Sequence, residues 1–197
     1  MPPSQKPSRQ PGKKWDYVGV AIGLAGLILG AIVLESRPTA SLEAATDPRN
    51  IFSTQIVISN DGAIPLEDVD VGVFIRGVRY LDGSVMQRAS GTRYQPPSNY
   101  LGIGQKKTIK LAPFNIVSSS PVTDADIGLI VCYRPILIPD WLWWGDPRVF
   151  RFDSVVQSDE TARLRQQPDD GKLLAEYADM LAENGKTPCP KIQSATN

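Results

Sequence analysis

Apolar and polar side chains alternate along several short stretches in the middle of the chain, between residues 50 and 157. In the stretch LEDVDVGVFIRGVRY, branched apolar side chains recur at every second position, and charged side chains stand between several of them. Such a period of two places the apolar side chains on one face of an extended strand and the polar ones on the other. The apolar set is Val69, Val71, Val73 and Ile75, opposed by Asp68, Asp70 and Arg76. The pattern predicts half-buried β-strands and restricts this part of the chain to a mainly β fold.

Turn residues separate the alternating stretches. NIFSTQIVISN places Phe52, Ile56 and Ile58 on one face, and it is followed by NDG at 60–62; a second turn signal, DG, stands at 82–83. Asn, Asp and Gly tolerate the positive φ of tight hairpin turns. Further strands are expected in SVMQR, near GTRY, and in QKKTIKLAPF, ADIGLIVCYRPIL and RVFRFDSVVQ. Short strands with no intervening helices favour an antiparallel β-sandwich over a parallel α/β sheet.

The first part of this region is similar to a known family. FSTQIVISNDGAIPLEDVDVGVFI resembles the opening hairpin of bacterial extracytoplasmic immunoglobulin-like domains, in which an apolar strand, an Asn-x-Gly turn and a Leu precede alternating Val. The matching positions are Asn60, Gly62, Leu66, Val69, Val71 and Val73. The resemblance implies an immunoglobulin-like antiparallel β-sandwich, here at residues 50–157, and it implies no active site.

An uncharged apolar run, YVGVAIGLAGLILGAIVL, occupies residues 17–34. As a helix these 18 residues extend about 27 Å, close to the roughly 30 Å core of a bilayer. The leader at 1–16 is rich in Pro, Ser and Lys, whereas the linker at 35–49 mixes both charges, so the positive-inside rule places the leader in the cytoplasm. The sequence therefore predicts a single-pass signal-anchor in the cell inner membrane with the rest of the chain periplasmic. A cleaved signal peptide is the alternative.

Glycines form a stripe along the predicted transmembrane helix. Gly19, Gly23, Gly26 and Gly30 follow one another at intervals of four, three and four residues, which places them on one face. Small residues on one face allow a second helix to approach closely. The stripe predicts a helix-packing face for self-association or a partner, and a lone anchor remains the alternative.

A C-terminal region at 158–197 is expected to contain a short amphipathic helix within PDDGKLLAEYADMLAENG. Asp170 is a plausible cap, and Asn184-Gly185 is a plausible stop. The apolar stripe consists of Leu173, Leu174, Tyr177 and Leu181. This stripe is expected to pack on the sandwich, with docking into a partner groove as the sharper alternative.

The chain has two cysteines, Cys132 in a predicted strand and Cys189 in the C-terminal tail. An extracytoplasmic location would permit a disulfide between them, but the spacing alone fixes no distance, so the bridge stays open. Two thiols without histidine do not complete a tetrahedral metal site. The carboxylates that cluster near strands are interpreted as solvated strand-edge charge; they are Glu67, Asp68, Asp70, Asp124 and Asp126.

The segment IPDWLWWGDPRVFRF concentrates three of the four tryptophans, Trp141, Trp143 and Trp144. Three hypotheses compete: a plug that caps the sandwich, a foot on the membrane interface, and a platform that stacks on a glycan or peptide. In an extended loop the three rings cannot all face one side, so at least one is expected to be exposed.

Charge and residue types narrow the function. Basic and acidic residues balance at 21 each, which gives no reason to expect a nucleic-acid partner, and histidine, the commonest general base, is absent. The sequence predicts a non-enzymatic, membrane-anchored extracytoplasmic module for protein–protein interaction or envelope scaffolding, with no cofactor. The alternative is a ligand-binding or accessory enzymatic domain that uses the loop at Trp141–Trp144.

Overall fold

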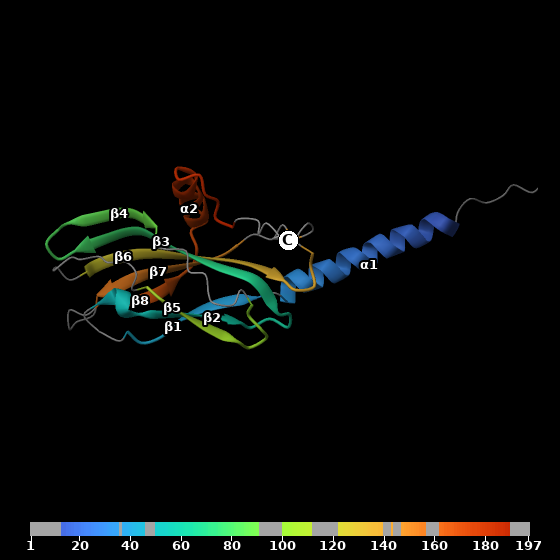
Figure 1. Cartoon of the computed structure of the whole chain (residues 1–197), viewed down its shortest axis with the longest axis horizontal. Coiled ribbons are helices and arrows are strands. Elements are labelled where there is room, and N and C mark those ends of the chain that lie inside the picture. Colours follow the sequence, from blue (N-terminus) through green and yellow to red (C-terminus); the bar gives the residue numbers. More distant parts are fainter. Residues whose placement is uncertain are drawn as a thin grey trace, which may run out of the picture. The chain divides into compact units, whose positions relative to one another are not determined.

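The computed structural model describes residues 13–35, 37–45, 50–90, 100–111, 122–139, 143, 147–156 and 162–189 (Figure 1). The chain divides into two units, residues 1–35 and 36–197, and each is described by itself. The elements in chain order are α1 (Lys13–Glu35), β1 (Pro38–Leu42), the 3-10 helix η1 (Ile51–Ser53), β2 (Gln55–Asn60), β3 (Leu66–Tyr80), β4 (Val85–Ser90), β5 (Lys106–Lys110), β6 (Val122–Pro135), β7 (Arg148–Val156), β8 (Ala162–Gln167) and α2 (Leu173–Ala182).

The second unit is built on two antiparallel sheets. One sheet has the strand order β1-β2-β5, and the other has the order β4-β3-β6-β7-β8. The predicted mainly β, antiparallel architecture is thus confirmed. Strands β5 and β7 lie within the stretches where alternation predicted them, and β4 and β6 overlap theirs but extend two residues after SVMQR and three residues before ADIGLIVCYRPIL. GTRY at 91–94 lies outside the described residues.

The limits of the β domain differ from the prediction of 50–157. The predicted linker at 35–49 contains strand β1, which pairs with β2, and the predicted C-terminal region contains strand β8, which pairs with β7. Both are edge strands with short or polar sequences, PTASL and ARLRQQ, that carry little apolar alternation. An edge strand contributes few side chains to the core, so the periodicity that marks central strands is weak there.

The predicted hairpin turn at NDG is wrong. Strands β2 and β3 belong to different sheets, so residues 61–65 carry the chain from one layer to the other. Residues 60–62 do not adopt positive φ, and Asn60 instead forms hydrogen bonds through its side chain to the segment between β2 and β3. The second turn signal is confirmed, because Gly83 has a φ of 83° in the tight turn between β3 and β4, and Tyr80 N–H bonds the carbonyl of Ser84.

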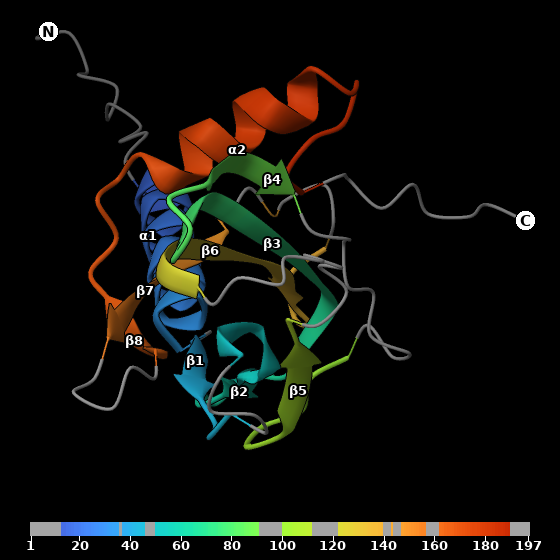
Figure 2. The same ribbon diagram turned by 90° about the vertical axis from the view of Figure 1, so that its left-hand side faces the viewer.

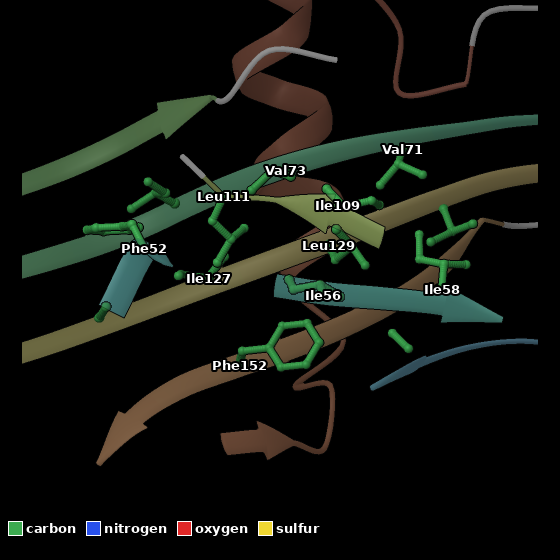
Figure 3. Packing of buried hydrophobic residues seen from close by; sticks show 14 of the residues in the cluster. Phe52, Ile56, Ile58, Val71, Val73, Ile109, Leu111, Ile127, Leu129 and Phe152 are labelled. Carbon is green, nitrogen blue, oxygen red and sulfur yellow. The ribbon is translucent and has the colours of Figure 1, made fainter. Parts of the chain in front are cut away.

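The hydrophobic core lies between the two sheets. Figure 3 shows Ile56, Ile58 and Ile109 of the three-stranded sheet facing Leu129 and Phe152 of the five-stranded sheet. All five side chains are at most 2% exposed. Burial of these branched and aromatic side chains, at roughly 1.5–3 kcal/mol each, is the main favourable term that joins the layers.

Strand β3 keeps its core face across fifteen residues because two of its three register irregularities against β6 correct its alternation. One lies between Glu67 and Asp70, where Asp68 has a φ of 55°, and the other lies between Ile75 and Gly77. Each inserts one residue into the alternation, as a β-bulge does. Core-facing side chains therefore occur at Leu66, then Val69, Val71, Val73 and Ile75, then Val78 and Tyr80.

Helix α2 covers the outer face of the five-stranded sheet. Figure 2 shows it lying across β3 and β6, on the side away from β1, β2 and β5. Leu173 and Tyr177 are buried against Phe74 and Ile130, and Leu174 and Leu181 pack at the margin. The prediction that the apolar stripe packs on the sandwich is confirmed. The five-stranded sheet is consequently apolar on both faces.

Two strand glycines permit this close approach. A Cβ added to Gly72 would overlap the hydroxyl of Tyr177, and one added to Gly128 would overlap the end of the Leu173 side chain. Both helix residues are buried, at 4% and 0% exposure, so neither can move aside cheaply. The absence of a Cβ at these two positions sets how near α2 lies to the sheet.

We expect Gly128→Ala to lower the free energy of unfolding by about 1–3 kcal/mol, because the added methyl would displace Leu173 from its site. The matched control is Gly77→Ala, where the new Cβ would lie 3.9 Å from the carbonyl oxygen of Met86, an ordinary contact. Urea denaturation of both variants is the measurement. Equal losses of unfolding free energy in the two variants would show that the close approach of α2 does not require a glycine at position 128.

Helix α1 is one continuous helix over 23 residues and includes the apolar run at 17–34. Its side chains are described for residues 19–31, and nearly all of these are exposed. Among the residues that the structure describes, no helix has the length and apolar character needed to cross a membrane.

Candidate functional site

Three features of the sandwich are candidates for a functional role. They are the outer face of the five-stranded sheet, which α2 covers, the end of the domain around Asn60, and the exposed apolar side chains at both ends of β3. The outer face is closed by a disulfide. Cys132 on β6 and Cys189, after α2, are bonded, with their Cα atoms 5.7 Å apart. The bridge closes a loop of 57 residues, for which loop entropy gives about 4 kcal/mol at most in an unstrained case.

The end of α2 follows the predicted stop signal. Gly185 has a φ of 67°, and the backbone N–H of Lys186 bonds the carbonyl of Leu181, which closes the last turn. At the start of the helix, however, Asp170 is not the cap residue that the sequence predicted. Helix α2 begins at Leu173 and lacks a side-chain cap, and Asp170 bonds the backbone N–H of Lys172 and pairs with an arginine of the sheet.

That arginine, Arg76, joins α2 to the sheet. Its Nε and Nη2 atoms donate to the two carboxylate oxygens of Glu176 on α2 at 2.7 and 2.8 Å. Its Nη1 atom lies 2.7 Å from Asp170 and 3.3 Å from Asp126 on β6. A guanidinium held by several carboxylates at once has far better geometry than a single exposed ion pair.

A second arginine extends this network. Arg151 on β7 donates to both carboxylate oxygens of Asp126, at 3.0 and 2.8 Å, and lies 3.6 Å from Asp170. The hydrogen bond with Asp126 raises the pKa of Arg151, and bonds with Glu176 and Asp170 raise that of Arg76. The bond from Arg76, aided by the backbone of Lys172, lowers the pKa of Asp170 from 3.8 to about 2.

We expect the domain to lose stability as the pH falls from about 4 to about 2, in part because Asp170 must then be protonated. A folded-state pKa below the unfolded value contributes stability that is present above pH 4 and lost on titration through pH 2. In Asp170→Asn this part of the loss of stability between pH 4 and pH 2 should disappear. The variant should also have a lower free energy of unfolding than the natural chain at pH 7. Urea denaturation of both chains at pH 7, 4 and 2.5 measures this free energy of unfolding.

The control for this titration is Asp169→Asn, which removes the exposed neighbouring carboxylate. It should keep the acid loss of the natural chain. An unchanged pH profile in Asp170→Asn would contradict the assigned role of the pair with Arg76.

The carboxylates near the start of β3 are also paired, which corrects the interpretation as solvated edge charge. Nη2 of Arg134 lies 2.7 Å from Glu67 and 3.0 Å from Asp68. The same guanidinium donates to the carbonyl of Ile138 at 2.7 Å and so holds the chain after β6. Glu67, Asp68 and Asp126 thus form ion pairs across strands. Sequence spacing gave no signal for these partners, which lie 25 or more residues away in the sequence.

Of the tryptophan cluster, the structure describes Trp143, whereas Trp141 and Trp144 lie outside the described residues. The Trp143 indole packs against the main core, and its centroid lies 5.8 Å from the ring of Tyr133. Its Nε1 atom donates to the carbonyl of Tyr133 at 2.7 Å. For this residue the contacts match the plug hypothesis, since the ring and its N–H are both engaged inside the fold.

Asn60 organises the end of the sandwich and was not singled out for this role by the sequence. Its side chain is fully buried; Nδ2 donates to the carbonyls of Ile64 and Leu101, and Oδ1 accepts from the N–H of Gly62. Its backbone bonds residues 104 and 105. One buried amide thus fixes the segment between β2 and β3 against the loop that precedes β5.

We expect Asn60→Ala to lower the free energy of unfolding by about 3 kcal/mol, because it leaves buried backbone groups without their partners. The control is Asn184→Ala at the end of α2, where an exposed amide donates to the carbonyl of Met180. That change should cost no more than about 0.5 kcal/mol. Denaturant melts of both variants test this, and a loss at Asn60 no larger than at Asn184 would contradict it.

Exposed apolar side chains gather at the two ends of β3. At the β3–β4 turn, Leu81 and Val85 are 69% and 55% exposed. At the opposite end, near Asn60, Ile103, Ile136 and Leu137 are 59%, 44% and 65% exposed. The two ends are roughly 45 Å apart along the strand, at about 3.3 Å per residue.

The glycine face of α1 is open in the structure, because a Cβ built on Gly19, Gly23, Gly26 or Gly30 would meet nothing within 4 Å. Its predicted role in helix packing stays a prediction. Within the described ranges, no group of three or more Asp, Glu or Cys side chains is placed to hold a metal ion.

Comparison of the chain with protein-family models, with curated proteins and with solved structures finds no match.

Proposed function

We propose that the chain is a membrane-tethered, extracytoplasmic β-sandwich module that binds a protein partner and catalyses no reaction. The observation that carries this proposal is the exposed apolar pair, Leu81 and Val85, on the two sides of the β3–β4 turn. Large apolar side chains that flank one turn present more contiguous surface than isolated exposed residues do, and such surface is typical of interaction sites.

The turn between them supports the proposal because it is well ordered internally. The Asp82 carboxylate accepts hydrogen bonds from the backbone N–H and the hydroxyl of Ser84, at 2.9 and 2.6 Å, and these bonds lower the pKa of Asp82. A preorganised turn loses little conformational entropy when a partner docks.

Strand β4 offers a second element for the same partner. Strand β4 pairs with β3 alone among the described strands, so no other described strand bonds the backbone groups of its outer edge. An extended peptide segment can bond such an edge and place alternate side chains beside Val85. We therefore favour a partner that adds a strand to this edge and covers the hairpin tip.

The extracytoplasmic location is supported by the bond between Cys132 and Cys189, since disulfides persist in oxidising compartments. The tether is supported by the uncharged run at 17–34 and by the basic leader before it, which together favour a single pass with the leader in the cytoplasm. The glycine face of α1 would then be available for self-association within the membrane. Kinship with bacterial immunoglobulin-like domains belongs to the same proposal.

The test is affinity capture of the full chain from native membranes in mild detergent. Leu81→Asp combined with Val85→Asp should reduce the co-purified partner by about tenfold or more, as expected when two central contacts worth 1 kcal/mol or more are lost. The matched control is Leu137→Asp, which is equally exposed at the other end of the sandwich and should retain the partner. Retention by the double variant would overturn the proposed surface.

A further inference from the structure

The opposite end of the sandwich carries apolar side chains that a protein partner at the β3–β4 hairpin would not reach. Ile103 lies in the loop before β5, and Ile136 and Leu137 follow β6. The N–H of Ile136 bonds the carbonyl of Pro65, and the N–H of Gly104 bonds the carbonyl of Asn60, so both loops are fixed to the same segment. The three side chains are held at one end of the domain by a hydrogen-bonded frame.

The beginning of β1 belongs to the same end. Pro38 pairs with Asn60, and the N–H of Asp61 bonds the carbonyl of Arg37. Helix α1 ends at Glu35 and β1 begins at Pro38, so the intervening chain spans about 11 Å at most. The chain therefore enters the domain at this end, and not at the β3–β4 hairpin. The proposed tether, which precedes β1 in the sequence, would hold this end nearest the bilayer surface.

We infer that this end of the sandwich rests on the lipid surface and inserts Ile103, Ile136 and Leu137 among the headgroups. The inference depends on the proposed function, since it requires the tether. Apolar side chains gain free energy when they leave water at the interface, and a tethered domain has already lost the entropy of reaching it. Exposed Arg37 and Lys106 at this end suit anionic headgroups, although Asp61 offsets one of their charges.

The experiment uses the full chain in vesicles of phosphatidylcholine and phosphatidylglycerol whose acyl chains carry an alkyne tag. The photoreactive residue p-benzoylphenylalanine replaces either Leu137 or, as a matched control, Leu81, which is equally exposed at the far end. Illumination should give tagged lipid adducts with Leu137→p-benzoylphenylalanine. With Leu81→p-benzoylphenylalanine the amount of lipid adduct should fall to the background level. Both positions are exposed, so melting temperature and the intact disulfide should match the natural chain.

Each other outcome overturns the inference in a distinguishable way. Equal lipid adducts at both positions, or none at 137 while the chain floats with the vesicles after an alkaline wash, would leave the tether intact and reject the lipid-facing end. A chain-to-chain adduct at 137 would assign this end to a second copy. A chain that the alkaline wash removes from the vesicles would reject the proposed tether and the inference together.

Discussion

The five-stranded sheet must bury apolar side chains on both of its faces, and the rest of the domain depends on how this demand is met. The inner face packs against the three-stranded sheet, and the outer face packs against α2. A helix can lie on a sheet only where the side chains beneath it leave room, and here Gly72 and Gly128 leave that room for Tyr177 and Leu173. Without α2, Phe74 and Ile130 would face water.

Ion pairs surround the apolar contacts between α2 and the outer face of the five-stranded sheet. Arg76 and Arg151 sit on β3 and β7 and draw in carboxylates from β6, from α2 and from the segment before α2. Each charge is partly removed from water. Arg76, Arg151, Asp126 and Asp170 each lie near more than one opposite charge, which limits the desolvation cost. The disulfide secures the other end of the helix segment, so α2 is held at its start by ion pairs and beyond its end by a covalent bond.

The sequence predicted the central strands and the edge strands β4 and β5, but it missed the edge strands β1 and β8, for a physical reason. Strands β3 and β6 lie inside the fold, so their alternation is strong, whereas β1 and β8 bury few side chains and give a weak signal. The sequence predicted a hairpin turn at Asn60, where the chain in fact crosses from one sheet to the other, because both kinds of connection use the same residue types. The pairing of Arg76 with Glu176 joins residues 100 positions apart, a relation that local patterns do not contain.

The irregularities in β3 bear on how the chain finds its register. A long strand of regular alternation is nearly symmetric under a shift of two residues, so misregistered pairings would bury almost the same side chains. The bulges at Asp68 and at Arg76 break this translational symmetry, because each must meet the matching place on β6. The bulges therefore favour one register of β3 against β6 and destabilise registers shifted by two residues. Two inserted residues in β3 thereby help to discriminate between the native sheet and its closest competitors.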